Sequence, residues 1–356
     1  MKAGMTLVDM AQELQRQADS KRDFIAPEQA LTMDVVQTEE LSPEVALTLG
    51  EVGSFGLRPH AHGQIAQHLK IPKAYYDRMR ADSPALLAQN VNHWLRQSDT
   101  QRMVRTLGGQ ARAYLSGKFR PLDHYDLADA VLPVLMDDGH VEIVSCAVTE
   151  TKLYLKAVTE CCQAEVQPGD VVQAGVVISN SEVGSGSLTV QPLLYRLICR
   201  NGAILNDMAM RKTHVGPQLA AFEERVEELL ADETKALRDQ ALWHMVRDVV
   251  KGALDEAVFL RNVQQWHEAT QQPITGDPAK VVEVTAQRLG CSQEERGGIL
   301  RHLIEGADLS RYGLANAVTR MSQDVESYDR ATDLERAGAQ IIELPPHEWE
   351  SLAVTT

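Results

Sequence analysis

The sequence is short of side chains that many ligand-binding proteins use. Only 5% of its 356 residues are aromatic, which is low for a protein that binds sugars or stacks many bases. The formal net charge of −15 argues against a general polyanion binder. Segments 1–60, 61–216 and 217–356 carry −5, +1 and −11, so the acidity lies at the two ends. A groove for an anionic ligand is therefore expected in the middle segment.

Cysteines and long apolar runs are also scarce. The cysteines are odd in number and widely spaced, which favours a reducing compartment: Cys146, Cys161, Cys162, Cys199 and Cys291. No stretch of 18 uninterrupted apolar residues occurs, and the first residues hold acids and glutamines where a signal peptide carries an apolar run. The sequence therefore predicts a cytoplasmic protein that does not cross a membrane.

The first part of the chain shows mixed periodicity. Apolar spacing indicates a helix over 7–21 and strands over 31–36 and 45–49. A helix-turn-helix-like pair follows, interrupted at Ile71-Pro72, and Pro84 begins another helix that should end near Gln97.

A hairpin and a sheet are predicted next. Met103–Leu107 and Ala111–Leu115 flank Gly108-Gly109-Gln110, a pattern typical of a tight reversal. A helix is expected over 124–136, and β-branched runs indicate an antiparallel sheet over 141–195. PLLYRLICRNG fits a strand or a short helix, and Pro192 slightly favours the helix.

The chain after Pro217 has helical spacing, with a capping box at Ser292 and Glu295. We therefore predict an α+β protein: an antiparallel sheet and hairpin middle domain flanked by helices, with a mainly helical C-terminal third. The predicted divisions are an N-terminal helix with short strands (1–60), an α+β core domain with basic clusters (61–216) and a helical acidic region (217–356).

Two basic clusters are the strongest candidate sites. The first has five cations and no acid between Arg102 and Leu122, with Arg105 and Arg112 on facing strands and Lys118 and Arg120 on the exit loop. Tyr114 and Phe119 could stack on bases or pack in the core. Together they suggest a phosphate-contacting groove, or else a solvated hairpin face.

The second cluster contains Arg196, Arg200, Arg211 and Lys212, against one acid, Asp207. A spacing of four places Arg196 and Arg200 on the same side in either a strand or a helix. These cations fit phosphate binding or structural bridges to acids of the C-terminal helices.

Other motifs give no catalytic set. Residues 179–187 match neither a phosphate loop nor a nucleophile elbow, so a flexible inter-strand loop is expected. Four histidines cluster in sequence without companion ligands at a recognised interval, so no metal or cofactor is predicted: His60, His62, His68 and His93.

Three separated segments carry a family resemblance. AYLSGKFRPLDHYDL, GVVISNSEVGSGSLTVQPLLYRLICRNGAI and LSRYGLANAVTRMSQDVESYDRATDLERAGAQII resemble a family of phage- and plasmid-like proteins, domain of unknown function nine-three-two. The resemblance covers roughly residues 50–345 and implies a mobile-element origin, in a bacterial host or virion. Besides Lys118, Arg120 and Arg196, the motifs mark positions of unknown role: Asp123, Ser181, Glu182, Gly184, Asn201, Gly202, Asn316 and Thr319.

Three functional hypotheses follow. The first is a non-enzymatic nucleic-acid-binding protein, similar in plan to phage single-strand annealing proteins, which would act in recombination or replication as a homo-oligomer. The second is a structural or assembly protein in which the basic clusters form salt bridges between subunits. The third, a metal-dependent nuclease, is less expected because the middle segment shows no convincing carboxylate cluster.

Overall fold

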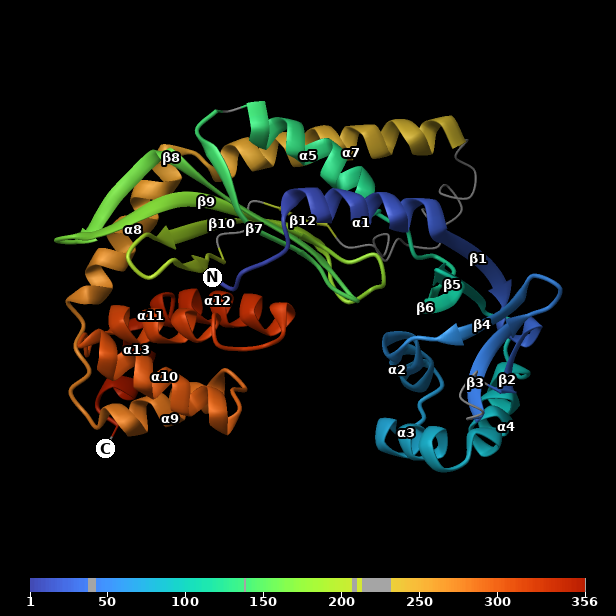
Figure 1. Cartoon of the computed structure of the whole chain (residues 1–356). Helices are drawn as coiled ribbons and strands as arrows, with labels where there is room; N and C mark the ends of the chain where they lie inside the picture. The colour runs from blue at the N-terminus through green and yellow to red at the C-terminus, as the bar shows by residue number, and fades with distance from the viewer. Residues whose placement is uncertain (38–42, 138, 207–209, 213–231, 356) are drawn as a thin grey trace.

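The computed structural model describes residues 1–37, 43–137, 139–206, 210–212 and 232–355. These residues form an α+β fold with a helical C-terminal third, which confirms the predicted class (Figure 1). The first sheet has the strand order β1-β5-β6-β4-β3-β2, and the second has the order β11-β10-β9-β8-β7, with β12 paired to β10. Paired strands are antiparallel, except that β4 and β6 run parallel.

The first sheet and three helices form what we call the small lobe. Leu47, Ile65 and Leu87 share one apolar core, so the predicted boundary at residue 60 falls inside a packed unit. The elements are β1 (Lys21–Pro27), β2 (Leu31–Gln37), β3 (Pro43–Leu49), β4 (Gly53–Leu57), α2 (Pro59–His68), α3 (Lys73–Asp82), α4 (Pro84–Leu95), β5 (Gln101–Leu107) and β6 (Gln110–Ser116).

Three helices cover one face of the second sheet. Leu14, Val131 and Val246 bring α1 (Leu7–Ser20), α5 (His124–Asp137) and α7 (Asp232–Ala253) onto apolar side chains of the strands. Figure 1 shows these helices lying together above the sheet. The strands are β7 (Val141–Val148), β8 (Leu153–Gln167), β9 (Asp170–Asn180), β10 (Leu188–Arg196), β11 (Asn201–Ile204) and β12 (Met210–Lys212).

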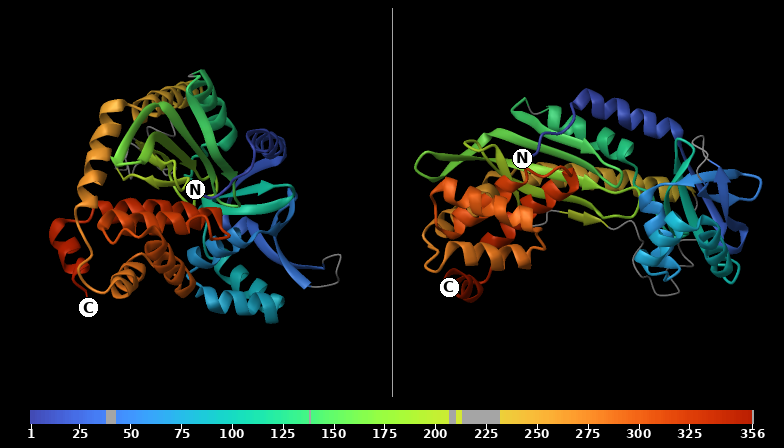
Figure 2. Two further views of the ribbon diagram at one scale, coloured as in Figure 1. Left: turned by 60° about the vertical axis from the view of Figure 1, so that its left-hand side comes forward. Right: turned by 60° about the horizontal axis from the view of Figure 1, so that its bottom comes forward.

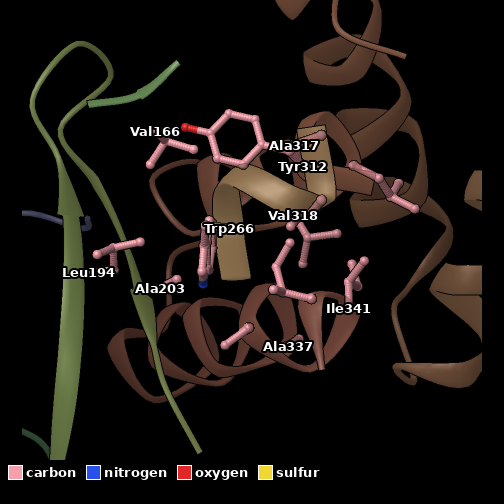
Figure 3. Packing of buried hydrophobic residues seen from close by; sticks show 14 of the residues in the cluster. Val166, Leu194, Ala203, Trp266, Tyr312, Ala317, Val318, Ala337 and Ile341 are labelled. Atoms are coloured by element: carbon pink, nitrogen blue, oxygen red, sulfur yellow. The ribbon is translucent and has the colours of Figure 1, made fainter. Parts of the chain in front are cut away.

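The C-terminal helices pack against this sheet in a second apolar core. Trp266 and Tyr312 meet edge to face, with ring centroids 5.8 Å apart, in a core that also contains Leu194 and Ala203 (Figure 3). The right-hand view of Figure 2 shows these helices away from the small lobe. They are α8 (Glu256–Thr270), α9 (Pro278–Arg288), α10 (Gln293–Gly306), α11 (Arg311–Met321), α12 (Tyr328–Ile342) and α13 (Pro346–Ala353).

Local signals predicted most elements correctly. The hairpin, the Pro84 helix and the Ser292–Glu295 capping box are all present. The preference for a helix at Pro192 is wrong, because Pro192 lies within β10 and pairs with Val176 of β9. The part of the post-Pro217 helix that falls on 217–231 lies outside the described residues.

Candidate functional site

The β5–β6 hairpin contains one extra residue. Arg105 pairs with Ala113 and Thr106 with Ala111, so Arg112 stands opposite no residue of β5. A bulge of this kind re-aims side chains, and here both Arg105 and Arg112 contact the loop that follows β9. The hairpin therefore directs two guanidinium groups toward the junction between the small lobe and the second sheet.

Arg105 is completely buried, with an exposed fraction of 0%. Its guanidinium forms a two-point ion pair with Asp23, at 2.8 and 3.0 Å, and a third contact of 2.8 Å with Asp123. It also donates to the Glu182 carbonyl at 2.9 Å. Buried charges are tolerated when paired in this way, and the paired Arg105 is not available to a phosphate.

Glu182 is the centre of the junction. Its carboxylate accepts a hydrogen bond from the Arg112 guanidinium and another from the His124 backbone N–H. Asn180 links the same region by donating to the Leu122 carbonyl at 2.6 Å. We call Arg105, Arg112, Asp123, His124 and Glu182 the polar junction; it joins β5, β6, α5 and the post-β9 loop.

The electrostatics of the polar junction keep its carboxylates ionised. Burial alone would raise the pKa of Glu182, but the facing His124 and Arg112 outweigh it and hold the pKa below its usual value. Burial likewise opposes ionisation of Asp123, whose pKa is lowered by Arg105 and Lys21. Burial lowers the pKa of His124 to about 4, so its imidazole is neutral near pH 7.

The loop after β9 differs from the flexible segment predicted from its glycines and serines. Ser181 and Glu182 are buried, and the Ser181 hydroxyl accepts a 2.9 Å hydrogen bond from the Ser185 N–H. Gly184 has a φ of +79°, and a β-carbon there would lie 2.7 Å from a Leu115 methyl group. The expected flexibility is wrong because buried contacts to the β5–β6 hairpin and to the start of α5 fix this loop.

A second buried cluster joins β10, β11 and α11. Arg196 pairs with Asp170 at 2.6 Å, and the Tyr312 hydroxyl donates to the same carboxylate at 2.6 Å. The Asn201 amide donates to the Thr319 hydroxyl at 2.6 Å. Two resemblance motifs therefore meet here, alongside a void of about 10 Å³ that Asn316 also lines, which is room for one water molecule.

The predicted phosphate-contacting clusters separate in the structure. The interpretation of Arg105 and Arg112 as a solvent-facing track is wrong, because carboxylates buried with them take up their charges. Tyr114 and Phe119 are buried in apolar clusters rather than available for stacking. Lys118 remains exposed, while Arg120 pairs with Asp239 of α7.

The second predicted cluster also divides. Arg196 and Arg200 do not lie on one side of a regular element, because Arg200 occupies an exposed turn with a φ of +49°. Gly202 is in β11, where Leu193 and Met1 leave no room for a side chain. Arg211 and Lys212 lie in β12, and their side chains are outside the described part of the structure.

An exposed cationic surface was missed by the sequence analysis. Segment 58–98 has six Lys/Arg and two Asp/Glu in a chain of net charge −15. Its exposed side chains include two aromatic rings, each 46% accessible, on α3 and α4. We call this set the α3–α4 surface: Lys70, Lys73, Tyr75, Arg78, Arg80, Trp94 and Arg96. The available signal was the positive charge of this short segment, which averaging over residues 61–216 concealed.

The acids at this surface hold its cations only weakly. Lys73 pairs with Asp77 at 2.8 Å and Arg78 with Asp82 at 3.5 Å, and all four side chains are at least 45% exposed. Exposed pairs of this type contribute between about 0 and 1 kcal/mol. A phosphate can therefore replace the carboxylates at little cost, unlike those in the polar junction.

Comparisons with family models, with curated proteins and with solved structures find no match for this chain. The resemblance to domain of unknown function nine-three-two therefore stays a prediction. Among the described residues, no three His, Cys, Asp or Glu side chains form a group that could hold a metal ion. No helix in the described ranges is long and apolar enough to span a membrane.

Proposed function

We propose that this protein binds single-stranded nucleic acid without catalysing a reaction, and that the α3–α4 surface makes the phosphate contacts. The observation that carries the proposal is the contrast between this surface and the polar junction. The arginines of the junction are neutralised inside the protein, whereas those of α3 and α4 are exposed. Figure 1 shows α3 and α4 at the end of the small lobe, clear of the acidic C-terminal helices.

The chemistry of the surface supports a single strand in particular. Single-strand binders combine cations that follow the backbone with aromatic rings on which bases stack. Tyr75 and Trp94 provide exposed rings on α3 and α4, the helices that also carry Arg78, Arg80 and, at the C-cap of α4, Arg96. The low total aromatic content does not oppose this function, because Tyr75 and Trp94 are exposed on the two helices that form the α3–α4 surface.

The assembly hypothesis has less support from the contacts. It requires the basic clusters to pair with acids of another subunit, but Arg105, Arg112 and Arg196 pair with acids of their own chain. Arg120 also finds its partner, Asp239, within the chain. Four of the cations that this hypothesis would use are thus already neutralised within the chain.

The test is fluorescence anisotropy of labelled single-stranded and duplex oligonucleotides across a salt series from about 50 to 200 mM. The variant Arg78→Gln, Arg80→Gln, Arg96→Gln removes three charges from the α3–α4 surface. We expect weaker binding and a salt slope reduced by about 2, since each phosphate contact to a single strand contributes about 0.7.

A matched control removes three exposed charges elsewhere. Lys280→Gln, Arg296→Gln, Arg301→Gln changes net charge equally on α9 and α10, where all three side chains are at least 40% exposed. It should retain wild-type binding. If the wild-type protein binds neither oligonucleotide at low salt, the proposal is overturned, and particle sizing would then address the assembly hypothesis.

A further inference from the structure

A groove of about 440 Å³ runs along α2 and reaches the first residue of α3. This volume falls within the range of about 300–1,000 Å³ that is typical of small-molecule sites. Pro59, Ala66 and Ile71 supply its apolar part, and its polar groups come from His60, Gln64, Gln67 and Lys73. The groove adjoins the α3–α4 surface, because Lys73 belongs to both.

Gly63 lines this groove and leaves the backbone of α2 accessible within it. It lies in the interior of α2, where glycine weakens a helix relative to alanine. The protein's own packing does not require glycine there, because a β-carbon at this position would meet nothing within 4 Å. A helical glycine that packing does not require suits a place where a ligand approaches the helix backbone closely.

The polar groups around the groove are partly fixed and partly unused. The Gln64 amide accepts from the Tyr114 N–H at 2.8 Å and donates to the Val183 carbonyl at 2.7 Å, which leaves one N–H. His60 Nε2 lies 2.9 Å from the same carbonyl, which fixes the ring. The Gln67 amide is exposed and has no partner among the described residues.

We propose that this groove binds an adenine base of the strand held on the α3–α4 surface; the inference rests on the proposed function. A glutamine amide pairs with adenine at two points, donating to N7 and accepting from the N6 amino group. Gln67 provides that pair, and Lys73 at the rim provides a cation for the adjoining phosphate. The absent side chain of Gly63 lets the flat base lie close to α2.

Two variants test the groove. Gly63→Ala should raise the thermal midpoint and weaken binding of a labelled oligo(dA) by roughly tenfold, within the range for one two-point base contact. Gln67→Ala should remove the preference of the protein for oligo(dA) over oligo(dT) while leaving salt-dependent binding. Gly297→Ala is the matched control, because Gly297 is also in the interior of a helix, with nothing within 4 Å of an added β-carbon.

The outcomes separate this inference from the proposed function. If the wild-type protein binds no oligonucleotide, both fail. If it binds, and Gly63→Ala and Gln67→Ala bind oligo(dA) and oligo(dT) as the wild type does, the groove is not the site and the α3–α4 surface stands alone. Loss of oligo(dA) affinity in Gly63→Ala, together with an increased thermal midpoint and an unaffected Gly297→Ala, supports the inference.

Discussion

His62 and His124 are buried histidines whose imidazoles are neutral near pH 7. Burial lowers the pKa of each to about 4, from an ordinary value near 6.5. The unfolded chain therefore takes up protons between pH 6.5 and 4 while the folded chain does not, so stability is present above pH 6.5 and is lost as pH falls. The buried carboxylates add their own loss only at lower pH.

We expect each buried histidine to reduce the free energy of unfolding by about 2 kcal/mol between pH 7 and pH 5. Urea unfolding at the two pH values measures the loss, and His124→Asn should make the dependence shallower by about half. His93→Gln, at an exposed position, is the control. An unchanged dependence in His124→Asn would contradict a neutral buried imidazole.

The Arg112–Glu182 pair gives a second prediction at this scale. Arg112→Met leaves the Glu182 carboxylate buried without its cation and should cost about 3–5 kcal/mol of unfolding free energy in urea titrations. Adding Glu182→Gln should recover part of that loss, because the amide oxygen still accepts from the His124 N–H. Arg16→Met, which breaks an exposed pair with Glu13, should change stability by less than about 1 kcal/mol. Equal costs for Arg112→Met and Arg16→Met would contradict the burial of this pair.

Among the elements, α11 and α12 pack unusually closely. A β-carbon on Gly338 would lie 2.2 Å from the Thr319 methyl group. Gly338→Ala should therefore destabilise the protein by about 1–3 kcal/mol, although alanine is the better helix former. Thr319→Ser removes the methyl group and keeps the hydroxyl that Asn201 contacts, so the double variant should regain part of the loss in thermal unfolding, while the Ala315 carbonyl at 3.0 Å stays in place. A Gly338→Ala midpoint at or above the wild type would contradict this packing.

Elements with strong local signals were predictable, and elements defined by distant partners were not. Gly108 and Gly109 both have positive φ, as the tight turn predicted from their sequence requires. In contrast, β4 (Gly53–Leu57) has two glycines and a parallel pairing to β6, more than 50 residues away. The bulge at Arg112 also has no signature in the local sequence, because a bulge is defined only by how β6 pairs with β5.

At the scale of the whole molecule, the second sheet and the C-terminal helices share one core. Val172 and Leu194 of the strands pack with Trp266, Val318 and Ile341. Lys156 of β8 and Glu335 of α12 also form a fully buried ion pair. The helical third is thus part of the same packed body as the sheet, a point that its helical spacing and acidity had left open.

Because they share this core, we expect the second sheet and α11–α12 to unfold together. Native-state hydrogen exchange should give their most protected amides the same opening free energy and the same denaturant dependence. The small lobe, joined by the polar junction and by a compact apolar cluster around Phe119 and Val183, provides the internal comparison. Opening of α11–α12 at a lower free energy than β9 would contradict a shared core.

The sequence identified several residues of the candidate site, but it did not predict which residues contact one another or which are buried. The sequence marked Asp123 and Glu182 as positions of interest, and the structure places both in the polar junction. Their surroundings depend on Asp23 and Lys21 of β1, and Lys21 is 102 residues before Asp123 in the chain, so no local pattern connects them. Charge counting also could not tell the buried Arg105 from the exposed Arg78, because exposure is a property of the packed chain.

The bulge also determines where the chain can change in length. Without Arg112, the ladder between β5 and β6 would continue regularly from Ala113 to Ala111, and the hairpin would lose nothing of its own hydrogen bonding. The loss would fall on Glu182, 70 residues further along the chain, whose carboxylate would be left in the interior without its cation. A deletion of Arg112 is therefore tolerated only with a second change that removes the charge of Glu182, so the length of this hairpin is coupled to the identity of one residue in the loop after β9.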